Sequence, residues 1–177
     1  KFRQYHQLAP HKLDLLAYEL QEALPEVDLW VPIRDYKNLN KRIEELLGTD
    51  DIKEINPLDR VISTPKYAAY LRISEGCNNF CSFCAIPYIR GRFKSRPYEE
   101  IIKEAKSLKE KGVKEISIIS QDTTNYAADF IGKRPNIYDL LKELDDMGFY
   151  SIRLLYLYPG EISDDLLYLV RDSKSIA

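Results

Sequence analysis

The sequence predicts an α/β fold, in which the first three βα units of a partial (β/α) barrel follow the remnant of another α/β domain. Two observations predict it. From Tyr67 onward, short apolar runs alternate strictly with segments of helical period, which is typical of parallel strands joined by crossover helices. Before that point the chain has the pattern helix, strand, helix. An eight-unit barrel needs about 250 residues, and this chain has 177, so we expect an open parallel edge.

Three regions follow from these patterns. Residues 1–48 are expected to form the C-terminal part of an N-terminal α/β domain. Residues 49–62 are polar at their start, contain proline and lack a period, so they are expected to form a linker. Residues 63–177 are expected to form the incomplete barrel, as its N-terminal half.

The N-terminal region supplies three predicted elements. Leucines at helical spacing predict a helix over residues 10–24. The apolar run 28–33 suits a short buried strand. Asn38 or Asn40 is placed to cap a second helix, which ends at Gly48.

The first barrel unit begins with a strand over residues 70–73, which leads directly into a loop with cysteines. Ser95 is placed to cap the following helix, with Pro97 near its first turn and Gly112 after its last. Acidic residues come early in this helix and lysines late, as the helix dipole favours. Its predicted buried stripe consists of Ile101, Ile102, Ala105 and Leu108.

The second and third units repeat the arrangement. Residues 113–120 form the next predicted strand, and a long polar loop over 121–135 leads to a helix over 136–147. Residues 151–157 form the third strand, followed by a helix near residues 163–169. Strands that are each followed by a helix imply right-handed parallel crossovers.

The composition excludes several classes of protein. With 45% apolar and 31% charged residues, the chain is neither disordered nor membrane-spanning, and we expect no membrane partner. The net charge of −2 gives no overall positive field for nucleic acid. The chain starts at Lys1 without a leader, so we expect a piece of a longer cytoplasmic protein.

All three cysteines lie in one loop, as Cys77, Cys81 and Cys84 with the spacing C-x3-C-x2-C. An odd, clustered set does not suit a disulfide framework. A structural zinc site would need a fourth ligand, and the two histidines, His6 and His11, lie far upstream. Unliganded structural cysteines and zinc remain open as minor alternatives, and an iron–sulfur cluster is favoured.

Iron–sulfur clusters are normally held by four cysteines. A local set of three leaves one iron without a protein ligand, and a small molecule can be activated there. An electron-transfer module of the ferredoxin kind is the alternative, and it would need a fourth cysteine. Because the loop follows a parallel strand, it lies where α/β folds place their chemistry.

The loop also resembles a known family motif. Cys77-x3-Cys81-x-Phe83-Cys84 is similar to the motif of the radical S-adenosylmethionine (radical SAM) superfamily, in which an aromatic residue precedes the third cysteine. Residues 73–77, 83–87 and 90–97 extend the resemblance to the methylthiotransferase family.

Two further strings, Ser120-Gln121-Asp122-Thr123-Thr124 and Tyr156-Leu157-Tyr158-Pro159, resemble the RimO type of that family. This type modifies an aspartate β-carbon of a small-subunit ribosomal protein. The alternative is the type that modifies adenosine in tRNA, which tends to carry Gly-Gln-Asn and a Ser-His-Pro-like end at these places.

The resemblance implies cofactors and site residues. Cys77, Cys81 and Cys84 would hold a [4Fe–4S] cluster, whose open iron chelates S-adenosylmethionine, and one electron would yield a 5′-deoxyadenosyl radical. It also implies that Phe83, Ser120, Gln121 and Asp122 contact this cofactor, Phe83 on the adenine side. It implies no catalytic residue beyond the cluster ligands.

The resemblance further implies a transferase with a ribosomal protein as substrate, tRNA as the alternative, and an electron donor as a partner. Family members hold a second, auxiliary [4Fe–4S] cluster through three further cysteines. This chain has none of those cysteines, so the auxiliary cluster is expected only in the full-length protein.

Several residues have a structural interpretation beside the functional one. Gln121 and Asp122 can cap the polar loop instead of binding a cofactor. Tyr156 and Tyr158 would face one way from the third strand, into a substrate cavity or into the core. Gly76 and Gly91 are suited to turns with positive φ at the ends of the cysteine loop. Alternating basic residues can form one strip, for an acidic partner or simply for solvent, and these are Arg90, Arg92, Lys94 and Arg96.

Overall fold

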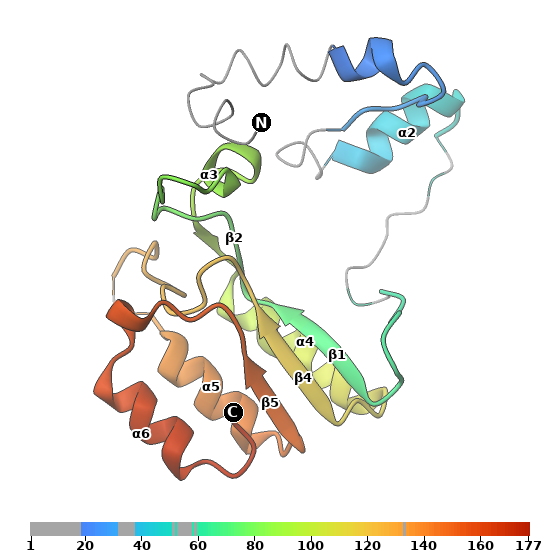
Figure 1. Cartoon of the computed structure of the whole chain (residues 1–177). Coiled ribbons are helices and arrows are strands. Elements are labelled where there is room, and N and C mark those ends of the chain that lie inside the picture. The colour runs from blue at the N-terminus through green and yellow to red at the C-terminus, as the bar shows by residue number, and fades with distance from the viewer. Residues whose placement is uncertain (1–18, 32–37, 51, 53–57, 59, 133) are drawn as a thin grey trace. The chain divides into compact units, whose positions relative to one another are not determined.

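The computed structural model describes residues 19–31, 38–50, 52, 58, 60–132 and 134–177 (Figure 1). The chain divides into two compact units. The first unit comprises Lys1–Asn56 together with Asn79–Gly91, and the second comprises Pro57–Asn78 together with Arg92–Ala177. The segment with the cysteines therefore belongs partly to each unit.

Helices form the regular structure of the described part of the first unit. Residues 19–23 are helical, within the predicted helix 10–24, whose earlier residues lie outside the described part. Helix α2 spans Leu39–Leu47 and ends at Gly48, as predicted. Asn38 is its N-cap residue, but its side chain makes no capping hydrogen bond. The short helix α3 spans Ile86–Ile89.

The strand predicted over residues 28–33 is wrong for its described residues, since residues 28–31 have no regular structure. An apolar run becomes a strand only when a neighbour satisfies its backbone hydrogen bonds. Among the described residues of the first unit there is no strand to do so. The remaining residues of that run, 32 and 33, lie outside the described part.

The second unit contains a parallel sheet of three strands in the order β1-β4-β5. Strands β1 (Ala68–Arg72), β4 (Glu115–Ile119) and β5 (Ser151–Leu154) pair as the sequence predicted. Ile176 continues the parallel pairing beyond β5, through an isolated bridge to Ile152.

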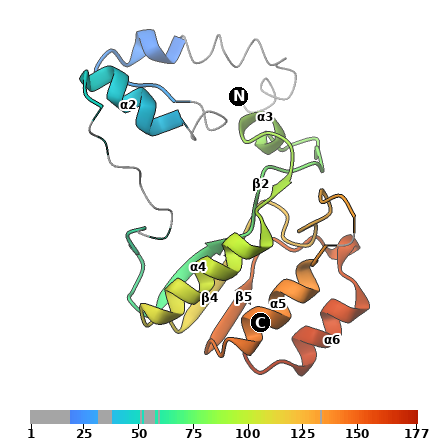
Figure 2. The same ribbon diagram turned by 180° about the vertical axis from the view of Figure 1, so that it is seen from behind.

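Three helices follow the strands and cover one face of the sheet: α4 (Tyr98–Glu110), α5 (Ile137–Asp146) and α6 (Asp164–Asp172), the last preceded by the 3-10 turn η4 (Pro159–Glu161). Figure 2 shows α4 and α5 in front of the strands. The alternating burial of the strands matches this cover, because only every second residue of β1 and β4 is buried. The fully enclosed core side chains include Leu71, Ile101, Ile116, Ile118, Leu140, Leu141, Leu144 and Ile152.

Two predicted details differ in the second unit. Ser95 does not cap α4, whose N-cap residue is Pro97; instead the Ser95 hydroxyl accepts a hydrogen bond from the Ala127 N–H at 2.8 Å. The third strand ends at Leu154 rather than Leu157, and Tyr156 beyond it has a φ of +61°. A positive φ breaks the extended geometry that continued pairing needs.

A two-stranded antiparallel ribbon was not predicted. Strand β2 (Ser74–Glu75) pairs with β3 (Lys94–Ser95), in the register Ser74 to Ser95 and Glu75 to Lys94. The chain leaves β2 toward the cysteines and returns to β3, so this ribbon closes both ends of the cysteine segment.

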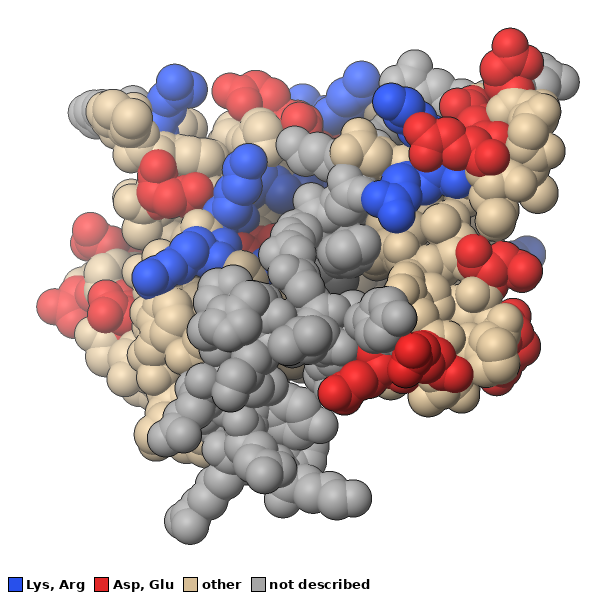
Figure 3. All heavy atoms as spheres, turned by 90° about the horizontal axis from the view of Figure 1, so that it is seen from above, with Lys and Arg blue, Asp and Glu red and all other residues tan. Residues whose placement is uncertain are grey.

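No helix among the described residues is long and apolar enough to cross a membrane. Basic and acidic side chains both lie on the face seen in Figure 3, as the net charge of −2 leads one to expect.

Candidate functional site

Three segments follow the carboxyl ends of the parallel strands and carry the candidate functional residues. The cysteine segment follows β1 through the ribbon, residues 120–135 follow β4, and residues 155–158 follow β5. Parallel sheets place these ends at one edge, which is where ligands bind in α/β folds.

The three cysteines are not in disulfide bonds. Cys77 is buried, with 8% of its surface exposed, and belongs to the second unit. Cys81 and Cys84 are half-buried, belong to the first unit, and are joined by a turn in which the Cys84 N–H donates to the Cys81 carbonyl at 2.9 Å. Among the described residues, no three His, Cys, Asp or Glu side chains stand grouped as a metal site.

Aromatic side chains accompany the cysteines in the first unit. Phe83 is 82% exposed, so its ring is accessible for contact with a ligand. The rings of Phe80 and Tyr88 pack edge to face, with centroids 6.0 Å apart. This packing ties the turn of Cys81 to α3, on which Tyr88 lies.

Gln121 reaches the start of the cysteine segment. Its Oε1 accepts a hydrogen bond of 2.7 Å from the Gly76 N–H, directly before Cys77. Gly76 has a φ of +76°, which a residue with a side chain rarely adopts, so the predicted turn with positive φ is confirmed here. Gly91, at the other end, has a φ of +87° and is confirmed as well. The Gln121 Nε2 has no hydrogen-bond partner in the part of the chain that the structure describes.

Ser120 and Asp122 are buried and engaged within the β4 loop itself. The Ser120 hydroxyl accepts from the Asp122 N–H at 3.0 Å. The Asp122 carboxylate accepts from the Thr124 hydroxyl at 3.0 Å and from the Asn125 side-chain amide at 2.8 Å. For Asp122 these contacts correspond to the capping interpretation of the sequence.

Two threonines, which sequence reasoning did not single out, join the β4 loop to the segment after β5. The Thr123 hydroxyl donates to the Leu155 carbonyl at 2.5 Å, and the Thr123 N–H donates to the Tyr156 carbonyl at 3.0 Å. The Thr124 hydroxyl accepts from the Tyr158 N–H at 2.9 Å. The signal in the sequence was a pair of adjacent threonines near the start of the polar loop after a strand.

Tyr156 and Tyr158 lie on this joined segment, with 66% and 48% of their surfaces exposed. Of the two interpretations of these tyrosines, the one that places them in the core is therefore wrong, and both are accessible from solvent. Because the strand ends before them, the strand alternation that would have made them face one way does not apply.

Ser74 is a third residue that sequence reasoning did not single out. It is fully enclosed in β2, three residues before Cys77, and its hydroxyl is the one buried side-chain polar atom without a partner among the described residues. A buried hydroxyl without a partner is costly and rare.

The basic strip is partly confirmed. Arg92 and Lys94 are exposed and alternate with the buried Phe93 and Ser95, as one face of an extended segment should. Arg96 shares their side of the chain but is only partly exposed, since it bonds to Glu104. His6 and His11 lie outside the described residues.

The donor types are those of an iron–sulfur cluster, although the described residues form no grouped metal site. Thiolates are the ligands that iron–sulfur clusters prefer, and three cysteines outside any disulfide are present at short spacing. The unpartnered Ser74 hydroxyl and the Gln121 amide add polar groups at the start of the same segment.

Comparisons with known proteins agree with this chemistry. The family model of the radical SAM superfamily matches residues 71–164. The chain is 42% identical over 167 residues to a protein of Clostridium acetobutylicum named ribosomal protein uS12 methylthiotransferase RimO. A protein of the same name from Clostridium tetani is 46% identical over 158 residues.

A third protein of that name, from Clostridioides difficile, is 42% identical over 167 residues. The alignments cover 89%, 84% and 89% of this chain for the three relatives in turn. They cover 37%, 35% and 37% of the relatives themselves, so the chain spans a little over a third of their length.

Proposed function

The chain belongs to the radical SAM superfamily, and from this membership we propose that it is part of an enzyme that inserts a methylthio group at an aspartate β-carbon of a small-subunit ribosomal protein. The observation that carries the proposal is the C-x3-C-x2-C segment after a parallel strand, in a chain 41–46% identical to proteins named RimO. In this proposal residues 63–177 form the first half of the barrel, and residues 1–48 and 49–62 form the preceding domain and linker.

Cys77, Cys81 and Cys84 would hold a [4Fe–4S] cluster as thiolates, and the open iron would take S-adenosylmethionine. When bound, this pair supplies one-electron cleavage of the sulfonium and hence a radical able to abstract hydrogen from the substrate. Phe83, with its exposed ring, is assigned to the adenine side. An external electron donor would supply the electron.

The chain's own residues position and enclose this chemistry. Gln121 fixes the backbone at Gly76 through its Oε1 and leaves its Nε2 for a ligand. Ser120 and Asp122 stabilise the β4 loop, so any contact they make with the cofactor would come from the same buried turn. The burial of Cys77 excludes water from one cluster ligand.

The substrate is proposed from the relatives and from the string Tyr156-Leu157-Tyr158-Pro159, whose two tyrosines are exposed after β5. The second candidate is a tRNA methylthiotransferase of the same family. The proposed location is the cytoplasm. An auxiliary cluster is proposed for the full-length protein from the resemblance to the methylthiotransferase family. Its ligands would lie outside this chain, because the three cysteines here are all assigned to the first cluster.

The experiment that tests the proposal uses the full-length protein, reconstituted with iron and sulfide without oxygen. It is expected to bind about four irons at this site and to form 5′-deoxyadenosine from S-adenosylmethionine under a reductant. The variant with all three cysteines changed to alanine is expected to form none. If it still produced 5′-deoxyadenosine, the cluster assignment would be lost.

Mass spectrometry of a deletion strain then separates the two substrates. The proposal expects the methylthio group to disappear from the ribosomal protein and to persist in tRNA. Loss of the group from tRNA alone would establish the second candidate instead.

A further inference from the structure

Glu104, a buried carboxylate on α4, lies between two arginines near β1, the edge strand of the described sheet. Only 7% of its surface is exposed. Its Oε1 accepts from Arg60 Nη1 and its Oε2 from Arg96 Nη1, each at 2.7 Å. Position 104 lies three residues after Ile101 and four before Leu108, so the helical period places it beside the buried stripe of α4. A carboxylate there is stable in the buried position because of its two arginine partners.

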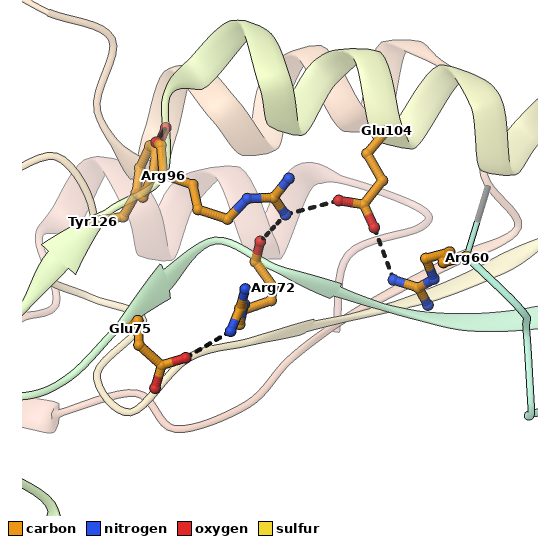
Figure 4. Close-up of polar contacts among 6 residues, drawn as sticks. All are labelled: Arg60, Arg72, Glu75, Arg96, Glu104 and Tyr126. Carbon is orange, nitrogen blue, oxygen red and sulfur yellow. Dashed lines mark hydrogen bonds and ion pairs between the residues drawn. The ribbon is translucent and has the colours of Figure 1, made fainter. Parts of the chain in front are cut away.

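Arg96 connects Glu104 to the end of β1. The same Nη1 that donates to Glu104 also donates to the Arg72 carbonyl at 2.6 Å (Figure 4). Arg72 is the last residue of β1, at the edge of the described sheet, so Arg96 supplies a donor there. We call the chain of contacts Glu104, Arg96 and the Arg72 carbonyl the brace.

The backbone of Arg96 is held as well. Its N–H donates to the Ile73 carbonyl at 2.8 Å, and its own carbonyl accepts from the Tyr126 hydroxyl at 3.1 Å. The neighbouring Ser95 N–H donates to Asp129 at 3.1 Å. The brace therefore adjoins a ribbon strand that is already fixed to the β4 loop.

Both ends of the cysteine segment start from this ribbon. The Gly76 N–H bonds to Gln121 on one side, and the Phe93 N–H donates to the Asn78 side chain at 3.2 Å on the other. A change in the ribbon at its base moves these ends, since only Gly76 separates β2 from Cys77.

We propose that Glu104 is a positioning residue for the candidate cluster, because through Arg96 it fixes the ribbon from which Cys77 is presented. This proposal rests on the proposed function. It gives Glu104, a helix residue far from the cysteines in sequence, a role in placing a cluster ligand. Without the carboxylate, the partly buried guanidinium of Arg96 loses its counter-charge and the contact that aims it at the Arg72 carbonyl.

Glu104→Gln tests the proposal, with Arg60→Gln as the matched control. E104Q keeps the shape of the side chain and removes its charge. R60Q removes the ion pair between Arg60 and Glu104 and leaves the brace in place. In the full-length protein without its cluster, we expect amide exchange at Gly76, Phe93 and Arg96 to rise about tenfold in E104Q, and less than about threefold in R60Q.

The second readout is spectroscopic. In the reconstituted proteins, the electron paramagnetic resonance spectrum of the reduced cluster should respond to S-adenosylmethionine at about tenfold higher concentration in E104Q than in R60Q. Glu104→Asp, which keeps the charge on a shorter side chain, should lie between them. If E104Q does not fold, as judged by its thermal transition, E104D against R60Q decides.

The outcomes separate the two proposals. Equal amide exchange rates in E104Q and R60Q would refute the positioning role of Glu104. Faster exchange in E104Q with an unchanged response to S-adenosylmethionine would refute it too, because Glu104 would then have a purely structural role. A wild-type protein whose cluster spectrum ignores S-adenosylmethionine would refute the proposed function, while the exchange measurement would still test the brace.

Discussion

Gln121 is the residue at which a structural and a cofactor role can be measured apart. Its Oε1 accepts from the Gly76 N–H at 2.7 Å, whereas its Nε2 has no partner among the described residues. Gln121→Ala removes both groups, and Gln121→Glu keeps the acceptor and removes the donor. The two variants therefore differ in which role they retain.

We expect Q121A to raise the exchange rate of the Gly76 amide about fivefold, since a hydrogen bond contributes about 1 kcal/mol. It should also weaken binding of S-adenosylmethionine to the reconstituted protein. Q121E should leave the Gly76 amide as protected as in wild type and still weaken that binding. Binding of S-adenosylmethionine by Q121E at the wild-type level, measured by equilibrium dialysis, would refute a cofactor role for the amide.

The neighbours of Gln121 show the limit of prediction from residue type. Ser120 and Asp122 were predicted together with it as cofactor ligands, yet their side chains bond within their own loop. A serine or an aspartate after a strand suits either use equally well. Whether such a residue binds a cofactor or stabilises its own loop depends on where Thr124 and Asn125 lie in the folded chain. The spacing of residues in the sequence does not give those positions.

At the scale of elements, hydrophobic periodicity predicted the helices and strands that are long enough to show a repeating pattern. Helix α4 buries the four predicted positions. Helix α5 begins at Ile137, one residue after the predicted start at Asn136, which is its N-cap residue and whose side chain accepts from the Asp139 N–H at 3.2 Å. The ribbon of β2 and β3 was missed because two-residue strands have no period to detect. The burial of Glu104 was missed because both of its partners, Arg60 and Arg96, lie outside α4, where the helical period does not show them.

Helices α4 and α5 are joined by a hydrogen bond that depends on pH. The Tyr98 hydroxyl donates to the Glu143 carboxylate at 2.6 Å. Burial, and next the hydrogen bond to Glu143, raise the pKa of Tyr98 above its ordinary value of about 10. A raised pKa means that the folded state holds the proton more tightly than the unfolded state does. The resulting stability is complete below about pH 10 and is lost as the pH rises toward the folded-state pKa.

We therefore expect the free energy of unfolding to fall as the pH rises above about 10, and to fall less steeply in Tyr98→Phe. At neutral pH, Y98F should be less stable by about 1 kcal/mol, the contribution of one hydrogen bond. Urea unfolding at a series of pH values measures both effects. Tyr150→Phe is the control, because Tyr150 is 78% exposed. The interpretation fails if Y98F and wild type keep a constant difference across the alkaline range.

At the scale of the second unit, the two faces of the sheet differ in character. The face under the helices is apolar and enclosed, with Leu71, Ile118 and Ile152 in its centre. The other face carries Tyr70, opposite Ser117 on the next strand, which in turn lies opposite Arg153. The sequence predicted the parallel strands and their crossover helices, whereas the alternating burial of β1 and β4 is seen only in the structure.

The sheet does not stop at β5. The N–H groups of Ile152 and Leu154 donate to the carbonyls of Ser175 and Ala177, at 2.7 Å and 2.8 Å, and the Ala177 N–H donates back to Ile152 at 2.9 Å. The Leu155 N–H points the other way and bonds to Ile118 on β4. Alternate amides of one strand thus report on its two neighbours separately.

Removing residues 175–177 should therefore expose the amides of Ile152 and Leu154 to exchange and leave the amide of Leu155 protected. We expect exchange at Ile152 and Leu154 to rise about tenfold or more, since both lose a strand partner, whereas Leu155 should change less than about threefold. Ile176 is 5% exposed, so its removal also takes a core side chain away and lowers the free energy of unfolding by about 2–5 kcal/mol. Site-resolved hydrogen exchange of the two chains measures the alternation. A uniform rise at all three amides would mean that the segment stabilises the unit only through packing, and that the parallel pairing beyond β5 does not persist in solution.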